Sequence, residues 1–322
     1  MKQTAATSQM NLWGMQRKPF FFMIDFEMAD IRLYPLEDLD DDIFLKTGLF
    51  TKENSEYRKT DLVSLSPRPV NFDSYKKSFD KVLKEINFGN SFLVNLTVKT
   101  PVELSGSLLD VYYQSKSLYK LYFKDQFVVF SPETFVRIEN GIISSYPMKG
   151  TIDALIPNAD QIILNDKKER AEHNTIVDLI RNDLSMVAKK VRVDKFRYLD
   201  KIKSRSGSIY QVSSRIIGEL PENYNETIGN IIITLLPAGS ISGAPKKKTI
   251  EIIRDAEEEP RGYYTGVCGV FDGYSLDSFV MIRYIQKDGS DYNYRSGGGL
   301  TFMSKTRSEY EEIIQKIYVP TN

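Results

Sequence analysis

Residues 119–146, YKLYFKDQFVVFSPETFVRIENGIISSY, decide the fold class of this 322-residue chain. The stretch contains four short runs that are rich in aromatic and β-branched residues, as β-strands are. The runs lie at 119–123, 127–130, 135–138 and 142–146. Asn140 and Gly141 stand between the last two runs, and this dipeptide is typical of a tight hairpin turn. The stretch therefore predicts strands that follow one another in hairpin order.

The surrounding sequence adds blocks of helices between further strands. We expect helices at 73–88, 165–189, 228–235, 246–257 and 307–318. We expect other strands at 20–24, 91–100, 191–199, 208–218, 266–271, 278–286 and 291–294. This order predicts an α+β fold and not the alternation of strand and helix in a Rossmann domain. Apart from its one strand, 1–70 is irregular, so we expect a short N-terminal segment packed on a main domain at 71–322.

Composition excludes several classes of protein and of site. The 43 Lys and Arg residues balance the 43 Asp and Glu residues, so nothing indicates a surface for nucleic acid or for an acidic membrane. The apolar run at 20–26 is too short to span a bilayer, and we expect a cytoplasmic protein. The single cysteine, Cys268, excludes an intramolecular disulfide, and the single histidine, His173, excludes a multi-histidine zinc site. A metal would therefore be held by carboxylates, which favours magnesium, calcium or manganese.

Lys149 stands in an unusual setting, Tyr-Pro-Met-Lys-Gly-Thr at 146–151. The proline fixes its own φ, and the glycine allows the backbone to approach a ligand closely. An ordinary surface lysine would satisfy this pattern, but a partly desolvated one could lose its proton and act as a nucleophile. That role requires the pKa of Lys149 to be depressed. Glu133, in Ser-Pro-Glu before a strand, could serve as the acid if an apolar site raises its pKa.

Two helices carry glutamates at the same spacing. Glu169 and Glu172 lie three apart on one predicted helix, and Glu309 and Glu312 lie three apart on another, so each pair shares a helical face. Lys316 lies four residues after Glu312, and the two could form no more than an exposed ion pair. Alternatively, the two glutamate pairs face each other across a pocket and share one hard cation.

Glycine-rich segments and one arginine suggest anion sites. The segment 237–246, PAGSISGAPK, leads into a helix, whose N-terminal amides attract carboxylate or phosphate. Ser-Gly-Gly-Gly at 296–299 follows a strand and could present bare amides to a carboxylate, although a tight turn is the simpler reading of either segment. Arg283 lies in an apolar strand-like run and suits two-point recognition of a carboxylate, with Tyr264 as a hydroxyl beside it. We expect Cys268 to be inert core and His173 to be a packing or helix-surface residue.

Taken together, these segments resemble the chorismate-utilising enzymes, which include anthranilate, isochorismate and salicylate synthases and component I of aminodeoxychorismate synthase. The resemblance runs in chain order from about 73 to 318. It is carried by SPE (131–133), YPMKGT (146–151), KERAEHNTIVDLIRNDL (168–184), GSISGAPK (239–246), RGYYTGVCGVFDG (261–273), FVMIRYI (279–285), SGGGL (296–300) and SEYEEIIQK (308–316). It implies a layered α+β fold, two largely antiparallel sheets in a sandwich with helices outside, and a chorismate-binding catalytic domain at 71–322.

The resemblance also implies a role for each candidate residue. It implies Mg²⁺ bound directly by Glu172 and Glu312, with Glu169 and Glu309 reaching the metal or its waters. The ring carboxylate of chorismate would be held by the amides of Gly297 and Gly299 and by Lys316. Tyr264 and Arg283 would hold the enolpyruvyl carboxylate, and Thr151 and Ser240 would complete the substrate contacts. Lys149 would attack the ring while Glu133 protonates the departing hydroxyl.

Two positions indicate the branch of the family. Lysine at 149 matches the aminodeoxychorismate enzymes, whereas anthranilate synthases have alanine there. Leu93 stands where isochorismate and salicylate synthases have a water-activating lysine. The resemblance thus implies amination of chorismate to 4-amino-4-deoxychorismate for para-aminobenzoate and folate synthesis. The ammonia would be free or would come from a glutamine amidotransferase subunit that forms a heterodimer with this chain. The alternatives are component I of anthranilate synthase and an inactive chorismate-binding scaffold subunit. Gln211 replaces a histidine that is frequent in the family, so a histidine role there is in doubt.

Overall fold

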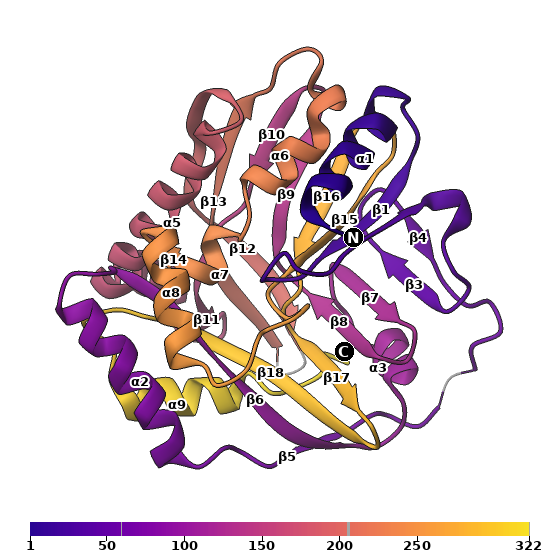
Figure 1. Ribbon diagram of the computed structural model, residues 1–322. Coiled ribbons are helices and arrows are strands. Elements are labelled where there is room, and N and C mark those ends of the chain that lie inside the picture. Colours follow the sequence, from indigo (N-terminus) through magenta and orange to yellow (C-terminus); the bar gives the residue numbers. More distant parts are fainter. Residues whose placement is uncertain (59, 205–206, 322) are drawn as a thin grey trace.

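The structure is a computed structural model and describes residues 1–58, 60–204 and 207–321. Residue 322, the end of the expected main domain, lies outside these ranges. Within them the chain forms two antiparallel sheets with helices on their outer faces, which confirms the predicted α+β sandwich (Figure 1). None of the described helices is long and apolar enough to cross a membrane.

The first sheet is built mainly from the middle of the chain. Its strands lie in the order β11 (Met148–Asp153), β13 (Gly207–Glu219), β10 (Ile142–Ser145), β9 (Thr134–Glu139), β16 (Leu276–Val280), β15 (Val267–Phe271), β1 (Phe20–Ile24) and β2 (Ile31–Pro35), with β12 (Lys189–Ser204) paired to β13. Asn140 and Gly141 both have positive φ, 51° and 74°, which is the geometry of the predicted two-residue hairpin between β9 and β10.

The second sheet faces the first. Its strands lie in the order β14 (Gly243–Ala244), β6 (Leu93–Leu104), β18 (Asp291–Leu300), β17 (Tyr284–Asp288), β8 (Phe127–Ser131), β7 (Tyr119–Phe123), β3 (Ile43–Lys46) and β4 (Thr51–Lys52), with β5 (Leu65–Pro67) paired to β6. The N-terminal segment, 1–70, therefore contributes strands to both sheets.

Strand β1 shows how one sequence run serves two cores. Its five residues, Phe-Phe-Phe-Met-Ile, are all fully buried. Successive side chains of a strand point to opposite faces, so Phe20, Phe22 and Ile24 join the core beneath the helices, while Phe21 and Met23 join the core between the sheets. Burial on both faces explains why this strand is continuously apolar and does not alternate.

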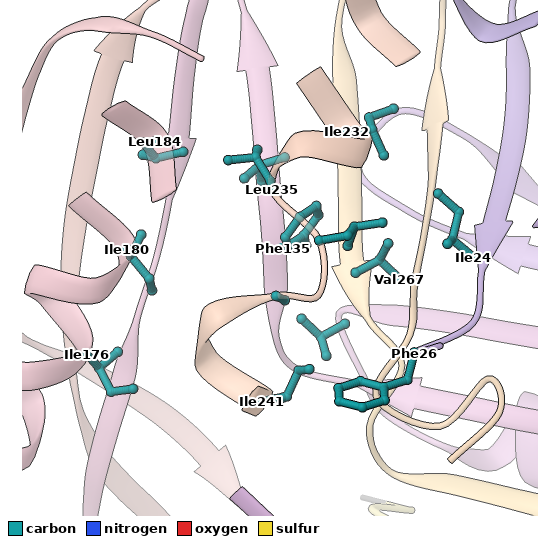
Figure 2. Close-up of a cluster of buried hydrophobic side chains, with 14 of the residues drawn as sticks. Ile24, Phe26, Phe135, Ile176, Ile180, Leu184, Ile232, Leu235, Ile241 and Val267 are labelled. Carbon is teal, nitrogen blue, oxygen red and sulfur yellow. The ribbon is translucent and has the colours of Figure 1, made fainter. Parts of the chain in front are cut away.

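Helices cover the outer faces of the sheets. They are α1 (Gln3–Met15), α2 (Phe72–Asn87), α3 (Leu108–Gln114), α4 (Ala159–Asn165), α5 (Lys167–Ser185), α6 (Ile228–Thr234), α7 (Gly239–Ser242), α8 (Lys246–Ala256) and α9 (Thr306–Gln315), with 3₁₀ turns at Leu36–Asp38 and Tyr224–Thr227. Figure 2 shows Ile176, Ile180 and Leu184 on one face of α5, opposite Phe135 of β9 and Leu235 after α6.

Several predictions about elements are wrong. Residues 3–15 are helical and not irregular, and α3 and α4 were not predicted. The expected helix at 165–189 is α5, which ends earlier, at Ser185, and begins after Asp166, whose side chain caps it by accepting a hydrogen bond from the Glu169 N–H at 2.9 Å. The expected strand at 278–286 is broken at 281–283, where the chain passes from one sheet to the other. The glycines at 297–299 are part of strand β18 and not a loop after it.

Candidate active site

A pocket of about 550 Å³ brings together all the residues that the sequence singled out. It is lined from both sheets and from α5, α7 and α9. The predicted residues on its wall are Glu133, Lys149, Thr151, Glu169, Glu172, Ser240, Tyr264, Arg283, Gly297, Gly299, Glu309, Glu312 and Lys316. Residues from distant parts of the chain, between Glu133 and Lys316, thus share one cavity.

Lys149 is held by an ion pair with the helix opposite. It is the second residue of β11, and its Nζ donates a hydrogen bond to Oε2 of Glu172 at 2.7 Å. Burial lowers the pKa of Lys149, but the charge and hydrogen bond of Glu172, with the charges of Glu169 and Glu312, outweigh burial and raise it. The expected depression of this pKa is therefore wrong, because the carboxylate of Glu172 lies in direct contact with the amine.

The four glutamates approach the pocket from two helices. Glu172 and Glu309 are buried, and Glu312 pairs with Lys316 at 2.7 Å. Burial raises the pKa of Tyr75 on α2, and the charges of Glu309 and Glu312 raise it further, so both carboxylates lie near that ring. Among the described residues, no three Asp, Glu, His or Cys side chains come together as a ready-formed metal site. Lys149 contacts Glu172, and Lys316 contacts Glu312.

The glycines of β11 and β18 let charged side chains of the pocket approach the backbone. A Cβ at Gly298 would lie 3.6 Å from Oε2 of Glu309 and 3.8 Å from Nζ of Lys316. A Cβ at Gly299 would lie 3.8 Å from Nζ of Lys149, and one at Gly150 would lie 3.0 Å from Oε2 of Glu169. The Nζ of Lys316 also donates to the Gly297 carbonyl oxygen at 2.9 Å. Strand β18 therefore lies close to both the proposed nucleophile and the proposed metal ligands.

Glu133 has the environment expected of an acid. It immediately precedes β9, and it accepts a hydrogen bond from the Ser240 hydroxyl of α7. Burial raises the pKa of the Glu133 carboxyl, although the Ser240 hydrogen bond and the charges of Arg283 and Lys149 act in the opposite direction. The direction of this pKa agrees with the requirement for an acid, and the catalytic role of Glu133 stays a prediction.

Arg283 and Tyr264 lie on the same pocket wall. Arg283 sits in the break between β16 and β17 with φ of 54°, a left-handed conformation that is uncommon for a residue other than glycine. Its guanidinium lies over the Tyr318 ring at 5.2 Å and donates to the Lys316 carbonyl oxygen at 3.4 Å. Tyr264 is buried. The strained turn therefore presents the arginine to the pocket, which a continuous strand would not do.

The sequence did not single out several lining residues. Ser296 is buried on the pocket wall, and its hydroxyl has no hydrogen-bond partner among the described residues, so it is available to a ligand. Thr265 lines the pocket next to Tyr264. Each belongs to a motif already quoted, so its place in that motif was the signal that could have found it. Gln211 also lines the pocket, and its amide contacts the Met148 sulfur.

His173 and Cys268 lie in the interior. His173 is 1% exposed, and its Nε2 is 2.6 Å from the Ser214 hydroxyl. Burial, with the charges of Arg197 and Lys149, lowers the pKa of His173 to about 4. It is therefore a packing residue of α5 and not a surface one. Cys268 is fully buried between the sheets, and burial raises the pKa of its thiol, as expected of inert core.

The family model described as chorismate binding enzyme matches residues 32–322. The chain belongs to this family. It is a chorismate-utilising enzyme. An "uncharacterized PabA-like protein" of Pasteurella multocida is 48% identical to it over 327 residues, covering 99% of each chain. Aminodeoxychorismate synthase component 1 of Bacillus subtilis is 31% identical over 311 residues, covering 91% of this chain and 63% of that protein. The crystal structure of anthranilate synthase component I from Streptococcus pneumoniae matches with a TM-score of 0.70 and 26% identity, covering 83% of this chain and 61% of that one.

Proposed function

We propose that this chain aminates chorismate at ring carbon 4 to give 4-amino-4-deoxychorismate, the precursor of para-aminobenzoate in folate synthesis. The observation that carries the proposal is the position of Lys149, inside the pocket with Glu133 and four glutamates. In the resemblance drawn from sequence, lysine at this position separates the aminodeoxychorismate enzymes from anthranilate synthases. The Bacillus subtilis relative bears the name of this activity.

The first step uses Lys149 and Glu133. The neutral amine of Lys149 forms a bond to ring carbon 2, both ring double bonds shift (to carbons 1 and 6 and to carbons 4 and 5), and the bond from carbon 4 to its hydroxyl oxygen breaks. Glu133 donates its proton to that oxygen, so the hydroxyl leaves as water and Glu133 becomes a carboxylate. The raised pKa of Glu133 supports this role, because the carboxyl keeps its proton to a higher pH than an ordinary glutamic acid.

The second step restores both residues. Ammonia forms a bond to carbon 4, both double bonds shift back, and the bond between carbon 2 and the Lys149 nitrogen breaks. The new ammonium group gives one proton to the Glu133 carboxylate. The sum of the two steps is chorismate and ammonia to aminodeoxychorismate and water, with Lys149 and Glu133 regenerated. A separate glutamine amidotransferase subunit, bound as a heterodimer, is the proposed source of ammonia.

The carboxylates of α5 and α9 fit a magnesium ion. Four carboxylates line one pocket, and hard oxygen donors are what Mg²⁺ prefers. Glu172 and Glu312 would hold the ion, with Glu169 and Glu309 contacting it or its waters. When bound, the ion would offset the negative charge of the ring carboxylate. In that state Glu172 and Glu312 would exchange their lysine partners for the cation, which leaves Lys149 and Lys316 to face the substrate.

The remaining residues orient chorismate. Arg283, held by Tyr318 and the Lys316 carbonyl, would bind the enolpyruvyl carboxylate with the Tyr264 hydroxyl. Lys316 and the amides of Gly297 and Gly299 would bind the ring carboxylate, and Thr151 and Ser240 would contact the ring substituents. Leu93 lies against the Gly299 side of the pocket, where a Cβ would be 3.1 Å from its Cδ1. A leucine there cannot activate water, which supports amination over hydroxylation.

Identification of the product tests the proposal. The purified protein would be incubated with chorismate, Mg²⁺ and ammonium chloride, and the products would be separated by chromatography with mass detection. We expect aminodeoxychorismate. Anthranilate would assign the chain to the anthranilate synthase branch, isochorismate would assign it to hydroxylation, and chorismate bound but unchanged would indicate a scaffold subunit.

A further inference from the structure

A buried tyrosine lies behind the wall of the active-site pocket. Tyr75 is the fourth residue of α2 and is 3% exposed, and it is not among the described residues that line the pocket. Its hydroxyl is buried and has no hydrogen-bond partner among the described residues. Buried polar groups are nearly always hydrogen-bonded, because a hydroxyl that leaves water without gaining a partner is costly. The Tyr75 hydroxyl therefore needs a partner that this arrangement of side chains does not provide.

Aromatic contacts hold Tyr75 against α9. Its ring centroid lies 5.5 Å from that of Tyr310, the residue that follows Glu309. Tyr310 also packs edge-on against Phe72 at 5.2 Å, and its hydroxyl donates to the Val70 carbonyl oxygen at 2.6 Å. Figure 1 shows α2 beside α9. The Tyr310 hydroxyl thus joins α9 to the segment before α2, whereas the Tyr75 hydroxyl makes no bond of this kind.

The Glu309 carboxylate is the candidate acceptor for the Tyr75 hydroxyl. Glu309 is 7% exposed, and a Cβ at Gly298 would lie 3.6 Å from its Oε2, so the carboxylate points inward to β18. Leu96 of β6 is paired with Gly298, and it belongs to the same apolar cluster as Tyr75. Tyr75 and Glu309 therefore approach the same part of these two strands, one from α2 and the other from α9.

Electrostatics also place the two groups near each other. Burial raises the pKa of the Tyr75 phenol, and the charge of Glu309 raises it further, followed by the charge of Glu312. Solvent and salt screen distant charges, so such an effect comes from nearby carboxylates. A phenol that keeps its proton is a donor, and its hydrogen bond to a carboxylate is of the strong, charge-assisted kind. Tyr75 and Glu309 are therefore matched as donor and acceptor.

We propose that Tyr75 is a positioning residue, whose hydroxyl donates a hydrogen bond to the Glu309 carboxylate when the proposed magnesium ion is bound. This inference rests on the proposed function, in which Glu309 contacts the ion or its waters. Groups that bond to metal ligands keep them in the required orientation, and their loss typically weakens metal binding about 10–100-fold. Phenylalanine at 75 would pack equally well, so the hydroxyl and not the ring supplies this contact.

Metal binding and stability, measured on two variants, test the proposal. Tyr75→Phe removes the unpartnered hydroxyl, and Tyr310→Phe is the matched control because it removes a hydroxyl from the same aromatic cluster. Electron paramagnetic resonance would measure the binding of Mn²⁺, as the probe for magnesium, with chorismate present and ammonium absent. We expect Tyr75→Phe to raise the Kd for Mn²⁺ at least about tenfold. In EDTA this variant should melt no lower than the parent protein, because the hydroxyl that it lacks has no partner.

The control should show the opposite pattern. Tyr310→Phe should keep the parental Kd for Mn²⁺ and should melt lower, because it loses the hydrogen bond to Val70. An unchanged Kd in Tyr75→Phe, or an equal rise in both variants, overturns the proposal. An equal rise would mean that the aromatic cluster only holds α9 in place.

A double-mutant cycle tests whether Tyr75 acts through Glu309. Glu309→Ala removes the acceptor and should itself raise the Kd for Mn²⁺. Adding Tyr75→Phe to Glu309→Ala should then change the Kd less than about twofold, because the effects of two groups in one hydrogen-bond network do not add. Full additivity overturns the proposal, and a parent protein that binds no Mn²⁺ removes the metal site and this inference together. Failure of the proposed function is a different result, in which the parent protein forms no aminated product.

Discussion

The Nζ of Lys149 and the Oε2 of Glu172 lie 2.7 Å apart and join strand β11 to helix α5 across the pocket. The proposed nucleophile and a proposed metal ligand are therefore partners of each other. A cation bound by Glu172 would replace Lys149 as the partner of this carboxylate. Metal binding by Glu172 would thus release the Lys149 amine from its ion pair. Several predictions depend on this exchange.

Loss of a proposed metal ligand should reduce the turnover that depends on magnesium. We expect Glu172→Gln and Glu312→Gln to reduce magnesium-dependent turnover by at least about 10–100-fold, the loss typical even of outer-shell changes. Glu311→Gln is the matched control, because Glu311 lies on the same helix and pairs at the surface with Arg307 at 2.8 Å. Turnover would be measured against magnesium concentration, and unfolding by circular dichroism. Parental turnover in either variant, or in a chelator, would remove magnesium from the proposal.

Arg283→Lys should weaken the binding of chorismate. An ammonium group keeps the charge but cannot form two parallel hydrogen bonds to a carboxylate. A hydrogen bond to a charged group contributes about 1.5–3 kcal/mol, so we expect a Kd at least about tenfold higher by calorimetry. Lysine tolerates the left-handed backbone no better and no worse than arginine does, so thermal stability should change little. An unchanged Kd would reassign Arg283 to the support of Tyr318.

Glu133→Gln should show opposite effects on activity and on stability. Because burial raises the pKa of Glu133, its folded-state pKa lies above its unfolded value. The stability that the protonated carboxyl contributes is fully present below the unfolded pKa, about 4.3, and is lost as pH rises through the raised pKa. Glutamine carries no charge, so the variant should melt higher than the parent at pH 8 but not at pH 4. Its turnover should fall about 10²–10⁴-fold, the contribution typical of a general acid. A lower melting temperature at pH 8 would contradict the assigned environment.

Ser214→Ala should destabilise the link between α5 and the first sheet. The Ser214 hydroxyl contacts His173 at 2.6 Å and accepts from the Arg197 N–H at 2.9 Å, and the side chains of Ser214 and His173 are buried. Its removal leaves a buried ring nitrogen and a backbone donor without this partner, at a cost of about 1–3 kcal/mol. Denaturant unfolding would measure the loss. Ser185→Ala, at an exposed position of the same helix, should stay within about 0.5 kcal/mol of the parent.

The sequence predicted the strands well where local pattern decides the structure. The hairpin at Asn140 and Gly141 formed as expected because its turn residues accept positive φ. Helix α1 was missed because its buried positions, Ala6, Met10 and Gly14, include two small residues that give a weak apolar signal. Gly14 is small for a tertiary reason, since a Cβ there would lie 2.0 Å from the Asn225 carbonyl oxygen. Such a contact cannot be seen in the local sequence.

The sequence predicted which residues line the pocket, but not which of them contact each other. The break at 281–283 could not be foreseen, because the run FVMIRYI has the composition of one strand and only the change of sheet interrupts it. The pairing of Lys149 with Glu172 was also missed, since 23 residues and a different element separate them. The motifs identified which residues line one pocket, whereas the ion pair of Lys149 with Glu172 reverses the expected direction of the Lys149 pKa.

Lys149 should become covalently attached to the substrate ring during turnover. Its amine is held inside the pocket by Glu172, and it lies in the wall that Glu133 shares, so a ring between Arg283 and Lys316 would be within its reach. Because Glu172 pairs with the amine and is also a proposed magnesium ligand, attachment should require magnesium. Intact-protein mass spectrometry with a chorismate analogue whose adduct breaks down slowly should show one added ring, mapped to the peptide that contains Lys149.

Lys149→Ala should lose both this adduct and most of the amination, while it still binds chorismate and magnesium. Lys305→Ala is the control, because Lys305 is an exposed lysine just before α9 and should leave the adduct unchanged. Nucleophilic catalysis divides one difficult substitution into two easier ones, so its loss should slow turnover far more than it weakens binding. If Lys149→Ala produces aminodeoxychorismate at the parental rate, ammonia attacks the ring directly. Lys149 would then act only through its charge, as the partner of Glu172.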